Sequence, residues 1–440
     1  MPTSQLTDPI TSLLPPELIT EIFQLCIPVL TQNHVYNGSN PHTTMEGPVL
    51  LCRVSRSWKD FVYSCPILWT NICVHRSSSL ENVNELSAWL ARSVNLPLAV
   101  CISLNLLDHI DAFTMLFNHP ARIRSLKFLN PAGKDVTWDF TSSPFTRLDT
   151  FAIESLSTLV PLPNLSAMVS AIILTAPHLY SIKWDFDDDS DPLITIGSQL
   201  KELDFATFVA DDRTYNVLRA CPKLVKLSVR YRSHSDPTGS GDVLLADLQI
   251  LHSSNFAMRG VVAPKLRRFA FKGYSDWIPD DLQSFIGHSP QLDDLDLDLI
   301  LYLADDLIYM MPHLTTISQL KIAVRTPDPI LLANEMFKTL TCHRDGETGS
   351  CPLPNLRHLD LHIDFLNTTP FMIGSDLSMS MLESRCRPHT LANLDGVIMS
   401  PLESFRFLGA GIITHEAKQR LQSLQAWGLS VLITTPLRST

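Results

Sequence analysis

The stretch Pro-Gln-Leu-Asp-Asp-Leu-Asp-Leu at residues 290–297 decides the fold that this chain is expected to adopt. Nearly the same phrase returns as Pro-Lys-Leu-Val-Lys-Leu-Ser-Val at 222–229 and as Pro-Asn-Leu-Arg-His-Leu-Asp-Leu at 354–361. Apolar residues at alternate positions are typical of a strand that is buried on one face. A strand unit that repeats along the sequence predicts a solenoid, in which each unit packs against its neighbours.

Looser copies of this strand phrase are found along most of the chain. They begin at Ile123, Leu148, Leu179, Leu200, Leu266, Ile317 and Leu402. From first residue to first residue, the copies lie 25, 31, 21, 24, 42, 26, 25, 39 and 46 positions apart. Five of these gaps match the roughly 20 to 29 residues of one leucine-rich repeat. The longer gaps require insertions, and residues 232–242 are the insertion expected in the 42-residue gap.

Between the strand phrases, the apolar period changes to that of a helix. In residues 211–221, Tyr215, Leu218 and Cys221 share one stripe, and a proline then ends the helix. The same design is repeated in segments 165–176, 279–289 and 304–311. Parallel strands need a crossover connection of about this length. The expected fold class is therefore α/β, with a right-handed leucine-rich-repeat-like solenoid over residues 80–440, a parallel concave sheet and helices outside.

The composition argues against several functional classes. Charged residues make up 18% of the 440, and Asp and Glu (45) outnumber Lys and Arg (34), which gives a net charge of −11. Nucleic-acid and membrane-surface binding normally need a basic surface, so neither partner is expected. Scattered cysteines without a Cys-x-x-Cys pair are typical of buried thiols in a reducing compartment. Residues 1–14 carry no basic residue, so a secretion signal is not expected, and we expect a cytoplasmic or nuclear protein.

Residues 11–75 are expected to form a separate helical module, after a disordered N-terminus at 1–10. Its first helix begins at a pair of prolines, which are tolerated in a first turn. The helix carries two apolar stripes, one of Leu18, Ile22 and Leu25 and another of Ile19, Phe23 and Cys26. A turn-rich insertion at 28–47 separates it from two short helices over 48–63. So small a core is marginal by itself, and the module needs either a partner or the solenoid.

Several segments of this module resemble the F-box, in the variant that fungal F-box proteins with irregular leucine-rich repeats carry. These segments are Leu14-Pro15-Pro16-Glu17-Leu18, Ile22-Phe23, Leu51-Cys52-Arg53-Val54-Ser55-Arg56-Ser57-Trp58 and Leu68-Trp69. In that family the F-box binds a Skp-type adaptor, which links it to a cullin ubiquitin ligase, and the C-terminal domain holds the substrate. The chain departs from the family at the insertion 28–47, where many F-boxes have a short turn.

The resemblance implies a substrate-recognition subunit of an SCF-type (cullin) E3 ubiquitin ligase, which is not itself an enzyme. The implied adaptor contacts are Leu14, Pro15, Pro16, Leu18, Ile22, Phe23, Leu51 and Val54. Trp58 and Trp69 are expected to pack inside the module. One stripe of the first helix would then face the module and the other the adaptor. The alternative is a leucine-rich-repeat scaffold outside any ligase, in which the N-terminal helices only cap the stack.

The outward positions of the strand phrases predict which side chains line the concave wall, because strand side chains alternate between faces. A basic stretch over the strands at 224 and 266 adjoins an acidic stretch at 292. The candidate substrate-binding residues are Lys226, Arg230, Arg268, Lys272, Asp294, Asp296, Asp298 and His358. Such bands favour a target protein whose acidic and basic segments lie in matching order. The alternative is that these positions are polar because strand faces are solvated.

No segment predicts a catalytic, cofactor or metal site. The aspartates at 294–298 alternate with leucines, which favours a strand face over a metal site. His358 and His362 would lie about 13 Å apart along a strand, too far to share one ion. The segment 342–351 has two cysteines and a histidine but no fourth ligand, so a mobile loop is expected there. The helix at 415–419 lacks the second histidine of the zinc proteases.

Overall fold

The computed structural model describes part of the chain, and the chain divides into two compact units, residues 1–204 and 205–440. The described residues are 13–27, 47–74, 80–103, 110–129, 144–154, 165–185, 198–208, 212–231, 243–254, 260–273, 279–300, 305–326, 328–342, 351–365, 371–373, 376–386, 399–408 and 411–434. The expected disordered N-terminus at 1–10 and almost all of the insertion at 28–47 lie outside these ranges.

The first unit begins with short helices and continues with alternating helices and strands. Its helices are α2 (Pro16–Cys26), α4 (Gly47–Cys52), α5 (Arg56–Ser64), η2 (Pro66–Trp69), α6 (Leu80–Arg92), α7 (Ile110–Phe117), η4 (Pro120–Arg122) and α8 (Leu165–Thr175). Its strands are β1 (Asn71–Val74), β2 (Leu98–Ser103), β3 (Ile123–Leu129), β4 (Thr150–Glu154) and β5 (Ser181–Asp185), and the chain leaves it within β6 (Glu202–Phe208).

The second unit alternates helices and strands throughout. Its helices are α9 (Asp212–Ala220), α10 (Pro279–Gly287), α11 (Asp305–Met310), η6 (Met311–His313), α12 (Pro329–Leu340), α13 (Asp376–Cys386) and α14 (His415–Ala426). Its strands are β7 (Lys226–Tyr231), β8 (Val243–Leu244), β9 (Ile250–Ser254), β10 (Val261–Val262), β11 (Arg268–Gly273), β12 (Asp294–Ile300), β13 (Gln319–Thr326), β14 (His358–Phe365), β15 (Phe371–Ile373), β16 (Ser404–Leu408), β17 (Gly411–Ile413) and β18 (Ser430–Thr434). The helices expected over 165–176, 211–221, 279–289 and 304–311 are confirmed as α8, α9, α10 and α11.

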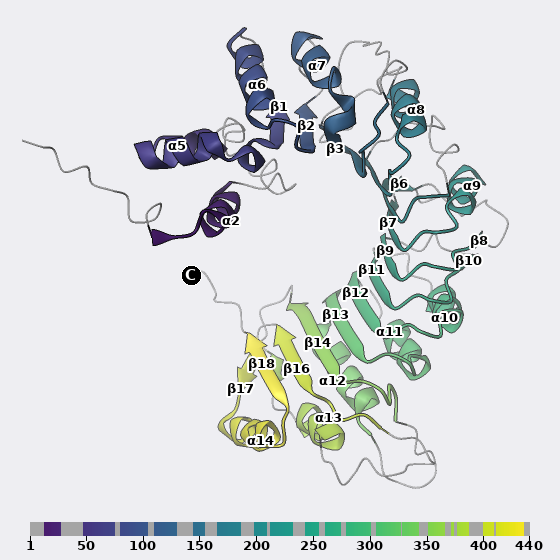
Figure 1. Ribbon diagram of the computed structural model, residues 1–440. Coiled ribbons are helices and arrows are strands. Elements are labelled where there is room, and N and C mark those ends of the chain that lie inside the picture. The colour runs from purple at the N-terminus through teal and green to yellow at the C-terminus, as the bar shows by residue number, and fades with distance from the viewer. Residues whose placement is uncertain are drawn as a thin grey trace, which may run out of the picture. The chain divides into compact units, whose positions relative to one another are not determined.

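Among the described residues, fourteen strands form one sheet in the order β1-β2-β3-β4-β5-β6-β7-β9-β11-β12-β13-β14-β16-β18. The ladder from β1 to β5 is parallel, and so is the ladder from β7 to β18. The α/β class and the large parallel sheet are therefore confirmed. In the second unit, α10 to α14 lie along one face of the sheet (Figure 1). We call the opposite face the open face.

The repeated leucines make the core between the sheet and its helices. In the second unit the register places Leu295 beside Leu320, Leu320 beside Leu359, and Leu359 beside Phe405. All four side chains are buried. Burial of each such side chain contributes about 1.5–3 kcal/mol, so each strand phrase stabilises the stack through a column that it shares with its neighbours.

The 42-residue gap after the copy at Leu224 contains a strand that the pattern does not predict. This strand, β9, pairs with β7 on one side and with β11 on the other. Leu248 and Leu251 are fully buried, as in the other copies, but Ser253 takes the third apolar position. An insertion alone was therefore the wrong explanation of this gap, because a further strand of the sheet lies within it.

Candidate functional site

Helix α2 presents apolar residues on two sides, as the sequence predicts. Ile19 and Phe23 face inward and are buried. The other stripe is exposed, at 46% for Leu18, 40% for Ile22 and 87% for Leu25. Cys26, which was expected on the inner stripe, is exposed. The helix thus contributes two residues to the core of the module and offers three to solvent.

Aromatic side chains hold the module together. The Phe23 ring lies 4.6 Å from that of Trp58 and 5.6 Å from that of Phe61, measured between ring centroids. Trp69 is fully buried and its Nε1–H donates to the Val62 carbonyl at 2.8 Å. The packing expected of the two tryptophans is therefore present, and α2, α5 and η2 share one small core.

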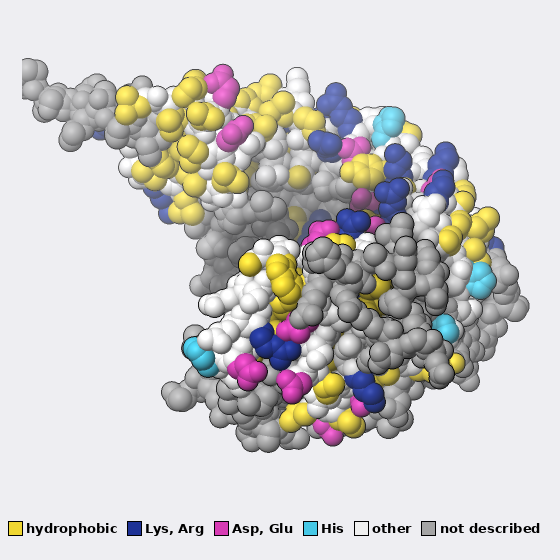
Figure 2. Space-filling model, turned by 90° about the horizontal axis from the view of Figure 1, so that it is seen from below, with side chains coloured by type: hydrophobic (Ala, Val, Ile, Leu, Met, Phe, Trp, Pro, Cys, Tyr) yellow, Lys and Arg dark blue, Asp and Glu magenta, His cyan; other side chains and the backbone are white. Residues whose placement is uncertain are grey.

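Large apolar side chains of this module remain exposed. We call the following residues the N-terminal apolar set: Leu18, Ile22, Leu25, Leu50, Val54 and Ile67, each at least 40% exposed. Hydrophobic side chains gather at the N-terminal end of the molecule (Figure 2). Proteins that act alone seldom expose large contiguous apolar patches, and such patches mark contact surfaces.

The expected adaptor contacts fall into two groups. Six are accessible: Pro15, Pro16, Leu18, Ile22 and Val54 are exposed and Leu14 is partly exposed. Phe23 and Leu51 are buried inside the module, so they position its helices and offer little contact area. Sequence reasoning did not include Leu25, Leu50 and Ile67 among the contacts. Only Leu25 had a signal in the sequence, because it belongs to the outward stripe of α2.

Charged side chains of the open face in the second unit are paired across neighbouring strands. Arg268 Nε lies 3.3 Å from Asp294 Oδ2, and Lys272 Nζ lies 3.2 Å from Asp298 Oδ2. On the other side of β12, Lys321 Nζ lies 2.9 Å from Asp296 Oδ2. Arg268 and Lys272 of the predicted basic band thus contact the predicted acidic band, whereas Lys226 and Arg230 lie on β7, which β9 separates from β11.

A second set of charges continues this pattern toward the C-terminus. Register places Asp296, Lys321, Asp360 and Arg406 side by side on β12, β13, β14 and β16, so their charges alternate in sign. Arg406 Nη1 lies 3.7 Å from Asp360 Oδ2. Such half-exposed pairs are each worth about 0–1 kcal/mol, so a charged partner could exchange with them at little cost.

Three further candidates also lie on strands of the second unit. Arg230 is exposed and Lys226 partly exposed, both on β7. His358 Nδ1 lies 2.8 Å from Ser404 Oγ, and its Nε2 lies 3.8 Å from Glu403 Oε2. Burial raises the pKa of Asp294, and the charge of Arg268 offsets part of this increase. The candidate wall is therefore a set of accessible charges, several of which are paired across neighbouring strands.

The first unit contains one more charged cluster, and this one is largely buried. Lys127 Nζ lies 2.6 Å from Glu154 Oε2, and Lys183 Nζ lies 2.7 Å from Glu154 Oε1. Ala152 lies between the two lysines in the register, so Glu154 at the end of β4 reaches both. Burial raises the pKa of Glu154, but the hydrogen bonds from the two lysines outweigh it and hold this pKa below its ordinary value.

No protein-family model matches this chain, and no curated protein matches its sequence. None of the helices in the described residues has the length and apolarity to span a bilayer. Within those same residues, no group of three or more His, Cys, Asp or Glu side chains is arranged to hold a metal ion.

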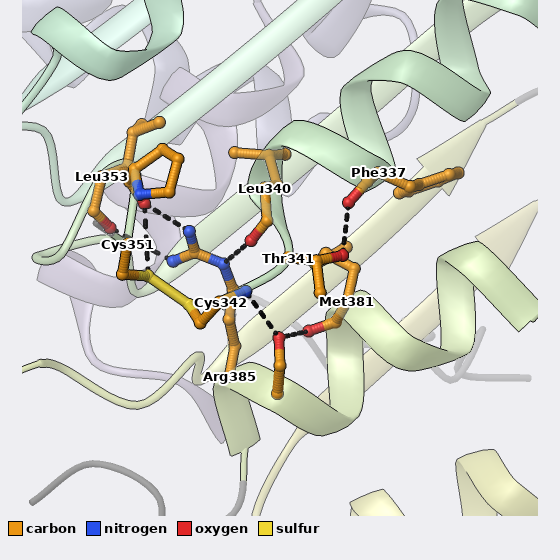
Figure 3. Close-up of a disulfide and its surroundings, with 10 residues drawn as sticks. Phe337, Leu340, Thr341, Cys342, Cys351, Leu353, Met381 and Arg385 are labelled. Atoms are coloured by element: carbon orange, nitrogen blue, oxygen red, sulfur yellow. Dashed lines mark hydrogen bonds between the residues drawn. A yellow bond between two sulfur atoms is a disulfide. The ribbon is translucent and has the colours of Figure 1, made fainter. Parts of the chain in front are cut away.

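The two ends of the segment 342–351, for which the sequence predicts a mobile loop, are described and are joined to each other. Cys342, just after α12, is joined to Cys351 by a disulfide (Figure 3). Residues 343–350 lie outside the described ranges. Fully buried Arg385 of α13 points to the same place, where its guanidinium donates to the carbonyls of Leu340, Pro352 and Leu353. Burial lowers the pKa of Arg385 to about 10. The buried cation therefore connects α13 to both ends of the segment.

Proposed function

We propose that this chain is the substrate-recognition subunit of an SCF-type (cullin) E3 ubiquitin ligase. In this proposal, residues 11–75 are an F-box of three helices with an insertion at 28–47, and they bind a Skp-type adaptor. Residues 80–440 are a right-handed leucine-rich-repeat-like solenoid whose concave sheet binds the target protein. The observation that carries the proposal is the exposed stripe of α2 within a module that already has a core of its own.

The energetics of the N-terminal apolar set support a contact with another protein. Burying one large apolar side chain contributes about 1.5–3 kcal/mol, so a set of six is a strong driving force for association. The set includes Leu18, Ile22 and Val54, three of the positions that the F-box resemblance assigns to the adaptor. Two independent arguments, one from motif residues and one from exposure, thus lead to the same surface.

The contribution of such a subunit to catalysis is positional. By binding the adaptor and the target at once, it raises the effective concentration of a target lysine near the ubiquitin-charged enzyme. No chemical step is assigned to this chain. Arrays of half-exposed charges suit this task, because complementary charge increases the encounter rate and selects the register of a partner.

The test is co-purification of the full chain with a recombinant Skp-type adaptor. Ile22→Glu places a charge in the exposed stripe, so we expect loss of the stoichiometric complex while the thermal unfolding midpoint stays unchanged. Leu174→Glu is the matched control, because Leu174 is an exposed leucine on α8, far along the chain from α2. Retention of the complex by the Ile22 variant would contradict the proposal. Phe23 is unsuitable for this purpose, since changing a core residue would unfold the module.

The alternative function is that of a scaffold whose N-terminal helices only cap the repeats, and three contacts with α6 favour it. The rings of Trp69 and Trp89 of α6 lie 5.1 Å apart in an edge-to-face arrangement. Arg92 of α6 lies over both Trp69 and Tyr63, at 4.5 and 4.4 Å from the ring centroids. The module is therefore packed on the first helix of the repeats. A cap alone predicts no complex between the wild-type chain and the adaptor.

A further inference from the structure

The last strand of the sheet, β18, has features of a strand that pairs with another chain. Gly428, with φ of 101°, ends α14 and turns the chain into β18. Within the described residues β18 pairs with β16 and with no strand on its other side. Its sequence, Ser-Val-Leu-Ile-Thr, contains no charged residue and no proline. Natural edge strands usually carry such residues to prevent pairing, and the five residues of β18 lack them.

The direction of the main chain shows which groups of β18 are available. The Ser430 N–H donates to the Glu403 carbonyl at 2.9 Å, so Ser430 directs its main-chain groups toward β16. Successive residues of a strand direct these groups to opposite sides. Val431 and Ile433 therefore direct their N–H and C=O groups away from β16, and Leu432 between them directs its groups back.

The side chains of β18 are also incompletely covered. Register places Val431 and Ile433 next to Phe405 and Phe407 of β16. The two phenylalanines are buried, whereas Val431 and Ile433 remain partly exposed. Leu432, on the open face, is 52% exposed. The apolar columns of the sheet thus end at β18 without a covering residue in the described part of the chain.

We propose that β18 pairs in antiparallel orientation with β18 of a second copy of this chain, about a two-fold axis at Leu432. In an antiparallel ladder, residues that exchange both hydrogen bonds alternate with residues that exchange none. An axis at Leu432 places Val431 opposite Ile433 of the other copy, and these are the residues with outward main-chain groups. Four hydrogen bonds result. The two Leu432 side chains then face each other at a position without hydrogen bonds, where side chains approach most closely.

A second copy fits this edge because the strand is complementary to itself. A two-fold axis places each residue opposite a residue of the same five-residue segment, so any charged residue at Leu432 would face its own kind. The segment is uncharged throughout, and no like charges meet. The same pairing would extend the apolar columns of Phe405 and Phe407 into the partner through Val431 and Ile433.

The test uses the mass of the purified full chain in solution at increasing concentration, measured by light scattering after size exclusion. The wild type is expected to form a dimer. Leu432→Lys and Leu432→Glu each place like charges opposite each other, and each should weaken the dimer about tenfold or more. An equimolar mixture of the two variants places opposite charges at the axis and should restore the dimer. The circular dichroism spectra of both variants should match that of the wild type, because Leu432 is half exposed and its substitution leaves the fold intact.

Two results would overturn the inference. One is a wild-type chain that stays monomeric over the whole concentration range. The other is a dimer that persists in both single variants, since this would place the interface elsewhere. Restoration by the mixture is specific to self-pairing at Leu432, because only a two-fold axis there brings the two substituted residues together. Adaptor binding depends on other residues, so its outcome does not affect this experiment.

Discussion

At the scale of single residues, the two charged groups that are buried in the described part of the chain are stabilised in different ways. Glu154 is held between two lysines, whereas Arg385 has carbonyl oxygens as partners. When one partner of a buried hydrogen bond is removed, the remaining polar group stays buried without a hydrogen bond, which lowers the stability of the fold. Both residues should therefore be among the most sensitive to substitution, although neither belongs to a proposed contact surface.

Arg385→Met should lower the free energy of unfolding by about 3 kcal/mol or more. The reason is that the substitution leaves three carbonyls near the segment 342–351 without their donor, at about 1–3 kcal/mol each. Urea unfolding followed by circular dichroism measures the change. Arg357→Met is the control, since Arg357 is half exposed and pairs with exposed Glu403, and it should change stability by about 0.5 kcal/mol or less. Equal effects of the two variants would contradict the role assigned to Arg385.

Glu154→Gln should make the stability of the protein less dependent on pH. Because the pKa of Glu154 is lowered in the folded chain, its contribution is present at neutral pH and is lost as the pH falls below about 4.3 through the lower folded value. At pH 7 the variant should be about 1–3 kcal/mol less stable than the wild type. This difference should shrink as the pH falls from 5 to 3, which denaturant midpoints over that range would measure. A difference that stays constant with pH would refute the assignment.

At the scale of elements, most strands of the large sheet could be predicted from the sequence, because each has three buried apolar positions with the spacing Leu-x-x-Leu-x-Leu. The pattern fails at β9, where Ser253 stands in the third position, and at β1, β2 and β18, which lack the full phrase. The burial of Phe23 could not be separated from the exposure of Ile22 by sequence alone, since adjacent apolar residues look alike until the neighbouring helices are placed. The disulfide and the position of Arg385 also depend on contacts between α12, α13 and residues 351–353.

Leu251→Ala tests whether β9 is an ordinary member of the stack. Leu251 is fully buried between β7 and β11, so the cavity should cost about 2–5 kcal/mol of unfolding free energy. Leu244→Ala of β8 is the matched control, because Leu244 is largely exposed, and its substitution should have little effect. Urea unfolding of both variants checks the prediction. A small effect at Leu251 would mean that β9 contributes little to the core.

At the scale of the whole molecule, the open-face charges can be tested for a role in target binding separate from their role in pairing. Reversing Arg268 and Lys272 to Asp should abolish target capture from the native cell at low salt. A second variant also carries Asp294→Arg and Asp298→Lys, which restores the two ion pairs. The sign of every charge that these four residues present to a target is then reversed. Capture should stay lost in the exchanged variant while stability returns. Recovery of capture on exchange would show that these pairs act only within the fold.

The order of strands in the sheet is the same as their order along the chain. Each strand released by the ribosome therefore meets an edge formed moments earlier, and none has to wait for a distant segment. Because neighbouring strands are close in the sequence, no long loop has to close before they pair, and the newest strand edge is unpaired only until the next strand is added. In the described part of the sheet, β18 is the last strand to be added, so its outer edge stays open for the second copy proposed above.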